Sequence, residues 1–101
     1  MLKLQGVIEA YNDGVITELE SMVLDCVLNE YVNYDGMCSE FQRTSKDVNI
    51  PMKQLKGVVG SLVKKDLVWT EDYKSGGITD QWIHATEKGL NIVGLNYEDL
   101  L

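Results

Sequence analysis

The chain has 101 residues, of which 45% are hydrophobic, and a formal net charge of −7 at pH 7. This length predicts a single domain over residues 1–101, and the hydrophobic fraction is enough for one core, which argues against disorder. The apolar runs are too short for a transmembrane helix and the N-terminus lacks the pattern of a signal peptide, so we expect a cytoplasmic protein without membrane association.

The N-terminal third predicts one long helix after a short lead-in. Residues 2–10 alternate loosely between apolar and polar, which fits either a short strand or the lead-in to a helix. Thr17 and Glu20 have the spacing of a capping box, in which each side chain binds the other residue's backbone amide. Apolar residues follow at helical spacing, so a helix is expected from Thr17 to about Val32.

Two shorter helices are predicted next. Ser39 is expected to cap a helix that ends near Val48. A third helix is predicted over residues 51–65, because Pro51 loses no hydrogen bond in a first helical turn. The apolar stripe of this helix is expected to pack with Trp69 against the first helix, and it consists of Leu55, Val58, Val59, Leu62 and Val63.

The C-terminal third predicts two strands and a helix. Residues 67–70 and 81–85 are expected to be strands on either side of a loop over residues 72–80, which contains two adjacent glycines. Thr86 is expected to cap a last helix that runs to about Leu95.

The order of these elements resembles the winged helix-turn-helix of MarR-like and related small bacterial or phage regulators. The resemblance covers roughly residues 37–95 and rests on the stretch IPMKQLKGVVGSLVKKDLV, on the strands around Gly-Gly, and on the Thr-Glu-Lys-Gly helix start at Thr86. It implies an α+β, mainly α fold with a small β-wing sheet. It also implies that the helix at 51–65 enters the major groove of duplex DNA. The chain departs from the pattern at Asp66, where the family often has a glycine that closes this helix.

Basic residues concentrate in the segment that would bind DNA. Residues 43–66 contain six of the nine basic residues against two acidic ones, a local net charge of +4. Charges farther apart than about 10 Å are largely screened at physiological salt, so this patch can bind phosphate on an acidic protein. Alternatively, the lysines are solvated side chains on a helix face and bind no ligand. The candidate DNA-binding residues are Arg43, Lys46, Lys53, Gln54, Lys56, Lys64 and Lys74.

Two features of this surface suggest a different partner. Gly57 and Gly60 stand where the family more often has larger polar side chains, and they permit close approach of DNA or of another helix, within the domain or across a dimer. The wing has Lys74 as its only cation, beside Asp72 and Asp80. The alternative function is therefore an acidic winged-helix protein-interaction module without nucleic-acid binding, such as a phage or mobile element encodes to bind a host protein.

The terminal segments are more apolar than solvated ends need to be. Palindromic DNA sites are read by twofold dimers, so a DNA-binding version of this domain is expected to be a homodimer. Residues 1–14 and 90–101 are left over after the winged helix is assembled, and one or both are predicted to form the dimer contact. In the alternative, the N-terminal segment joins the wing sheet, the tail packs on its own domain, and the protein is a monomer.

Few residues are suited to catalysis or metal binding. Cys26 and Cys38 form no CxxC motif and the chain has one histidine, whereas a zinc site needs about four such ligands. We therefore predict two reduced thiols, with Cys26 in the core, and no metal. His84 is expected to be structural or surface-exposed rather than a general base. The sequence predicts no enzyme and no cofactor.

Overall fold

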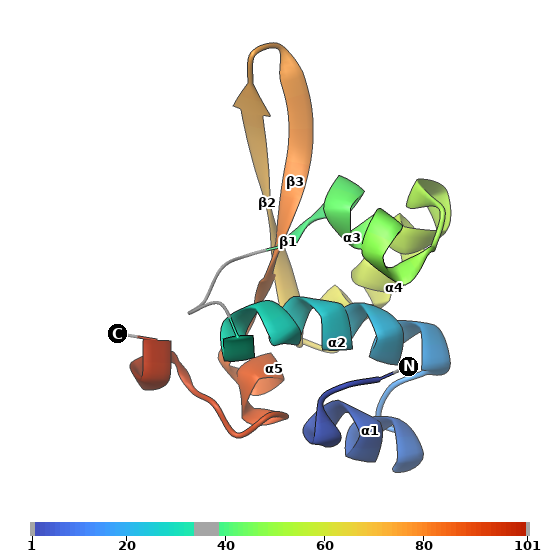
Figure 1. Cartoon of the computed structure of the whole chain (residues 1–101), viewed down its shortest axis with the longest axis vertical. Helices are drawn as coiled ribbons and strands as arrows, with labels where there is room; N and C mark the ends of the chain where they lie inside the picture. The colour runs from blue at the N-terminus through green and yellow to red at the C-terminus, as the bar shows by residue number, and fades with distance from the viewer. Residues whose placement is uncertain (1, 34–38, 101) are drawn as a thin grey trace.

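The computed structural model describes residues 2–33 and 39–100 (Figure 1). Its helices are α1 (Gln5–Asn12), α2 (Glu18–Asn33), α3 (Phe41–Val48), α4 (Met52–Lys64), α5 (Glu87–Asn91) and the 3-10 helix η1 (Tyr97–Leu100). Its strands are β1 (Ser39–Glu40), β2 (Val68–Ser75) and β3 (Ile78–Ala85), which form an antiparallel sheet in the order β1-β3-β2. None of the helices in these described ranges is long and apolar enough to cross a membrane.

Helix α2 crosses the middle of the domain, between α1 on one side and α3 and α4 on the other (Figure 1). Its start confirms the predicted capping box: the Glu20 amide donates to Thr17 Oγ1 at 3.2 Å, and the Thr17 amide donates to Glu20 Oε1 at 2.8 Å. Near its end, the Tyr31 hydroxyl accepts a hydrogen bond from the Ala85 amide at 3.0 Å, which ties α2 to β3. The fully buried residues of α2 are Val23, Leu24, Val27 and Leu28.

The prediction that Ser39 caps α3 is wrong. Ser39 lies in β1, opposite Ile83 of β3, and the residue at the N-cap of α3 is Glu40, whose side chain makes no capping hydrogen bond. Pairing with a strand more than forty positions away supplied a structural role that local capping signals could not reveal. Helix α3 ends at Val48 as predicted, where Asn49 takes the left-handed conformation with φ of 55°.

Helix α4 buries a narrower stripe than predicted. Leu55, Val59 and Leu62 are buried as expected, and Val58 is half-buried, but Val63 is 42% exposed. Successive helical residues are about 100° apart, so Val63 falls outside the arc that the rest of the domain covers. After the helix, Asp66 adopts a φ of 59°, the left-handed conformation for which glycine is the usual residue.

The predicted loop over residues 72–80 is instead the outer half of a hairpin. Strands β2 and β3 pair without interruption from Val68 opposite Ala85 to Ser75 opposite Ile78. Only Gly76 and Gly77 form the turn, with φ of 57° and 81°, as the tight two-residue hairpin turn requires. The hairpin projects beyond the helices (Figure 1), which explains why its outer half is polar.

The expected burial of Trp69 is also wrong. Val68 faces the core and is 1% exposed, whereas Trp69 is 44% exposed. Consecutive residues of a strand point to opposite faces of the sheet, so burial of Val68 places Trp69 on the outer face.

Helix α1 packs against the turn after α5. Thr86 caps α5 as predicted, accepting a hydrogen bond from the Gly89 amide at 3.0 Å, but the helix ends at Asn91 rather than near Leu95. The N-terminal segment forms a helix, and a Cβ on Gly6 of α1 would lie 1.9 Å from the carbonyl oxygen of Ile92. Close backbone contact with the turn after α5 therefore requires glycine at this position.

Candidate nucleic-acid interface

Helix α4 is held at both ends and presents a polar surface to solvent. Pro51 precedes its first turn, and the Leu55 amide donates to the Pro51 carbonyl oxygen at 2.9 Å. Its buried stripe packs toward α2 and fixes the direction of the opposite surface. The exposed residues of α4 are Lys53, Gln54, Lys56, Gly57, Gly60, Val63 and Lys64.

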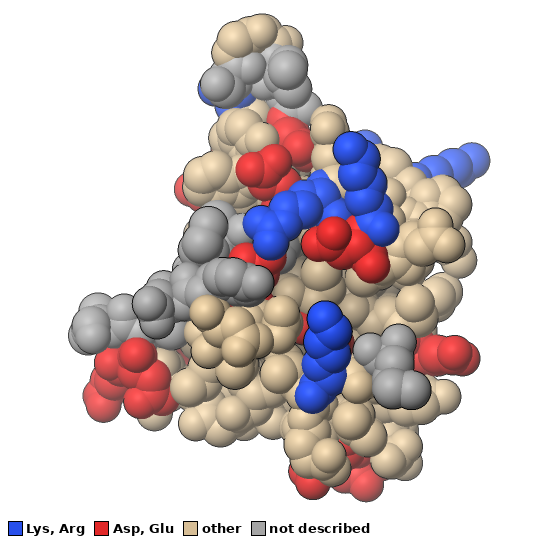
Figure 2. Space-filling model, in the orientation of Figure 1, with Lys and Arg blue, Asp and Glu red and all other residues tan. Residues whose placement is uncertain are grey.

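The four polar candidates on α4 lie on this exposed surface, and none of their side chains has a hydrogen bond or ion pair with another described residue. Lys46 of α3 is also exposed and unpaired within the described ranges, as is Lys74 near the tip of the hairpin. Figure 2 shows Lys and Arg side chains gathered over α3 on one face of the molecule, with Asp and Glu side chains beside them. Neighbouring acidic side chains thus partly offset the local excess of positive charge on this face.

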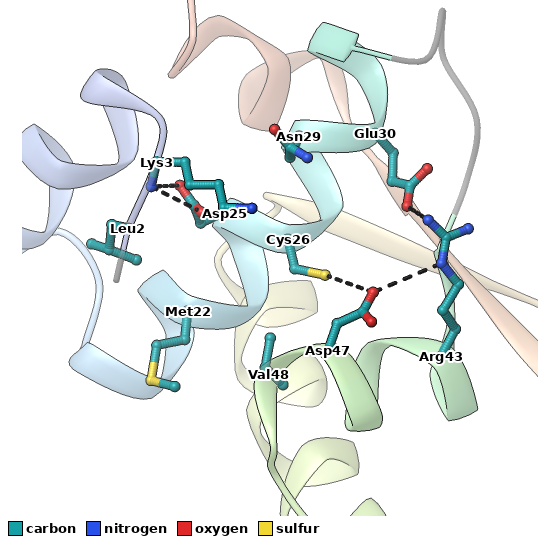
Figure 3. A pocket seen from close by; sticks show the side chains of 10 residues that line it. All are labelled: Leu2, Lys3, Met22, Asp25, Cys26, Asn29, Glu30, Arg43, Asp47 and Val48. Atoms are coloured by element: carbon teal, nitrogen blue, oxygen red, sulfur yellow. Dashed lines mark hydrogen bonds and ion pairs between the residues drawn. The ribbon is translucent and has the colours of Figure 1, made fainter.

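Arg43 differs from the lysines because it is paired internally. Its guanidinium forms an ion pair with the buried carboxylate of Glu30, and its Nε lies 3.7 Å from Asp47 Oδ2 (Figure 3). The side chain is 48% exposed, so a guanidinium edge still faces solvent. The Arg43–Glu30 ion pair therefore joins α3 to α2, a structural role that the sequence did not indicate.

The Arg43 pairs form one rim of a polar cavity of about 460 Å³ between α2, α3 and the N-terminal segment (Figure 3). The opposite rim is Asp25, whose carboxylate accepts hydrogen bonds from the backbone amides of Lys3 and Leu4. Cys26 also lines this cavity, half-buried rather than in the core as predicted. Burial and the nearby carboxylates raise the pKa of its thiol to about 11, so it is protonated at neutral pH.

Gly57 and Gly60 leave the middle of the outer surface of α4 without side chains. A Cβ on either glycine would meet no atom of the described residues within 4 Å. The prediction that they permit close approach of another helix within the domain is therefore wrong, and the approach of DNA or of a second chain stays a prediction. The space that these glycines leave is open to solvent.

A groove of about 730 Å³ separates α4 from the hairpin. Its helical wall includes Lys56, Gly60 and Lys64, and its hairpin wall includes Asp72 and Asp80. The two walls thus have opposite charge. An anionic ligand is favoured on the α4 side and disfavoured toward the hairpin.

The end of α4 is fixed by a buried carboxylate. Glu20 of α2 accepts hydrogen bonds from Lys65 Nζ at 2.7 Å and from the hydroxyl of Ser61. Lys65 is one of the six basic residues in the 43–66 segment, so this pair neutralises one of those charges. Sequence spacing identified Glu20 as a capping residue, but its partners lie more than forty positions away, where no local pattern could indicate them.

The sequence matches no protein-family model and no curated protein. The structure is similar to the crystal structure of the S. aureus MepR–DNA complex, with a TM-score of 0.63 over 88% of this chain and 68% of that chain, at 18% sequence identity. The fold is a winged helix-turn-helix. In this winged helix, α3 and α4 form the helix-turn-helix and the β2–β3 hairpin is the wing, which confirms the α+β, mainly α fold that the resemblance implied.

Proposed function

We propose that the chain is a small winged-helix transcriptional regulator that binds duplex DNA through α4. The observation that carries the proposal is the outer surface of α4, where three lysines and a glutamine flank a bare stretch of helix and have no partner among the described residues. Lysines can bind phosphate or guanine, and glutamine can pair with adenine in two places. The similarity to a protein–DNA complex supports this use of the helix.

The proposed residues have different roles. Lys53, Gln54 and Lys56 lie near the start of α4, the part of a recognition helix that meets base edges. Lys64 at its other end and Lys46 on α3 would bind phosphates and so set the position of the protein on the duplex. The roles of the two remaining candidates follow from their surroundings. Arg43 would contact phosphate with the part of its guanidinium that faces solvent, and Lys74 would reach the backbone from the tip of the wing.

The acidic wing limits how tightly such a protein binds. Asp72 and Asp80 stand on the wing side of the groove, where they repel phosphate. We therefore propose that α4 dominates DNA binding and the wing contributes little. The alternative, an interaction module without nucleic-acid binding, explains the acidic wing but not the unpaired lysines of α4.

Fluorescence anisotropy with a labelled duplex of about 30 base pairs tests the proposal. Binding is expected at low salt, and about four phosphate contacts would weaken it roughly 100-fold between 50 and 200 mM salt. Replacing both Lys53 and Lys56 by Glu should abolish binding. The matched control replaces Lys3 and Lys88 by Glu, which changes the net charge equally at positions away from the exposed surface of α4.

Two results would contradict the proposal. Absence of binding to any duplex at low salt would exclude DNA as the ligand of α4. Equal weakening by the two double variants would show that binding depends on net charge rather than on this helix.

We further propose that the regulator acts as a homodimer, because twofold symmetry matches the two half-sites of a palindromic operator. Some of the terminal apolar residues are packed on their own domain, namely Leu2, Leu4, Val93 and Leu95. Tyr11 in the last turn of α1, Val15 after this helix and Tyr97 in the tail are 39%, 53% and 46% exposed and remain available to a second copy.

A further inference from the structure

The face of the wing that points away from α4 has a composition of its own. Alternation along the strands and the register between them place its residues in three rows. Trp69 lies opposite His84, and Tyr73 lies opposite Asp80. Between these rows, Trp82 of β3 is flanked by Glu71 of β2 and by Glu40 of β1.

Contacts between the side chains confirm that they share this face. The rings of Trp69 and His84 are stacked, with centroids 4.1 Å apart, and those of Tyr73 and Trp82 are tilted at 5.0 Å. His84 Nε2 lies 3.1 Å from Glu71 Oε1, which holds the imidazole against the indole. On the other side of the face, the Tyr73 hydroxyl donates to Glu40 Oε2 at 3.3 Å.

The face combines aromatic rings with carboxylates and is accessible. Trp69 is 44% exposed and the Glu71 side chain is 51% exposed. The carboxylates of Glu40 and Glu71 belong to the face, whereas Asp80 at its edge also lines the groove beside α4. None of the described side chains of the face is a lysine or an arginine, and Lys74 alternates to the other side of β2. Phosphate is therefore repelled here, whereas a cation finds both π faces and negative charge.

We propose that this face docks an arginine-bearing segment of a partner protein. A guanidinium is planar, so it can stack on the exposed indole of Trp69 while donating to the carboxylate of Glu71 beside it. A lysine ammonium cannot form both contacts with the same geometry. The face lies on the opposite side of the sheet from α4, so docking leaves the proposed DNA-binding surface free and does not depend on DNA binding.

The chain provides its own reporters for this face, because its two tryptophans, Trp69 and Trp82, both belong to it. The probe is a peptide of alternating glycine and arginine, and the controls are the same peptide with lysine or with glutamate in place of arginine. The arginine peptide is expected to change the tryptophan emission and to shift the indole N–H signal of Trp69 in an NMR spectrum. The lysine peptide should bind more weakly, and the glutamate peptide should not bind.

Two variants with matched controls separate this site from general attraction to an acidic protein. Trp69→Ala should weaken binding of the arginine peptide about 2- to 5-fold, the usual contribution of an exposed cation–π contact. Glu71→Gln should weaken it by a similar factor without removing the ring. Glu98→Gln and Asp99→Asn each remove an exposed carboxylate from the tail, and they should leave affinity within about 2-fold of the starting value.

Trp69→Phe provides a second test that keeps a ring on the sheet, and it should retain part of the affinity that Trp69→Ala loses. The proposal is overturned if the wing variants and tail variants weaken binding equally, since binding would then reflect net charge. It is also overturned if a DNA duplex shifts the two indole signals as the peptide does. Indole shifts that depend on protein concentration alone would assign the face to a second copy of the chain instead.

Discussion

Glu20 shows how one side chain can serve both a local and a long-range role. Its carboxylate accepts hydrogen bonds from the Thr17 amide, from Ser61 and from Lys65. Burial raises the pKa of this carboxyl, but the bonds from Lys65, Ser61 and Thr17 outweigh burial and hold the pKa at about 2, below its ordinary value of 4.5. The charged form is therefore favoured in the folded state, and it joins the start of α2 to the end of α4.

This pKa predicts how stability depends on pH. Because the folded-state pKa is depressed, the contribution of Glu20 is complete above about pH 4.5 and is lost as the pH falls toward 2. Glu20→Gln should lower the free energy of unfolding by about 1.5–3 kcal/mol at neutral pH, as loss of charged hydrogen bonds does. The difference between the two proteins should shrink as the pH falls through this window. Urea denaturation at several pH values measures it.

Glu18→Gln is the matched control for Glu20→Gln. Glu18 is an exposed carboxylate in the first turn of the same helix, so its replacement should change stability by less than about 1 kcal/mol. A difference between Glu20→Gln and the unchanged protein that stays constant from neutral pH down to pH 2 would contradict the pH dependence derived from the Glu20 pKa.

At the scale of the element, α4 has two faces that place opposite demands on its residues. Leu55, Val59 and Leu62 are selected by packing, since each is at most 2% exposed. Gly57 and Gly60 lie on the other side, where packing within the domain requires nothing of them. Glycine inside a helix costs about 1 kcal/mol relative to alanine. Packing among the described residues therefore does not explain these glycines, whereas the proposed contact with DNA would.

Alanine at both glycines separates stability from binding. Gly57→Ala with Gly60→Ala should raise the free energy of unfolding by about 1–2 kcal/mol, because each added methyl group enters open space. The same variant should weaken duplex binding, because the methyl groups hold the helix away from the groove floor. Denaturant unfolding and anisotropy measure the two effects. Greater stability with unchanged affinity would show that the glycines do not serve DNA contact.

The wing, the β2–β3 hairpin, is a second element whose residues are explained by pairing and packing. Its outer half is polar and therefore resembles a loop when read as composition, yet all eight residues of β2 are paired with β3. The Gly76-Gly77 turn accounts for this pairing, since two adjacent glycines with positive φ match the twist of a tight hairpin. A polar strand is stable here because the sheet needs a buried face only at its base, where Val68, Ile83 and Ala85 reach the core.

For the molecule as a whole, the proposed dimer depends on side chains at the two ends. Gly6 brings α1 against the turn after α5, whereas the tail with η1 lies across the domain from α1 (Figure 1). Light scattering at micromolar concentration should give about twice the 11.4 kDa chain mass. Val15→Glu with Tyr97→Glu should then produce monomers, because charged side chains in an apolar contact oppose association.

Two outcomes bear on this dimer prediction. A mass near 11.4 kDa for the unchanged protein would contradict it and favour the monomer. Tyr97→Glu alone, compared with Val15→Glu alone, shows which end carries the contact. Both residues are exposed, so neither change removes a core contact.

The sequence by itself determined the features that arise within a few residues along the chain. The capping box at Thr17, the cap at Thr86, the helix start after Pro51 and the buried positions Leu55 and Leu62 were predicted and confirmed. Each depends on a hydrogen bond or a periodicity that spans at most about two helical turns, so nearby residues contain all the information needed. The order of the predicted elements was also enough to predict the winged-helix fold.

Only the tertiary structure decided which residues face a neighbour and which face solvent. Trp69 and Val63 are apolar like core residues, but they are exposed because α4 covers only one face of β2, and α2 and α3 cover only one side of α4. Arg43 and Lys65 belong to the basic segment, yet Glu30 and Glu20 bind them across thirteen and forty-five positions. Such pairs arise from the packing of distant segments, and no local pattern in the chain specifies them.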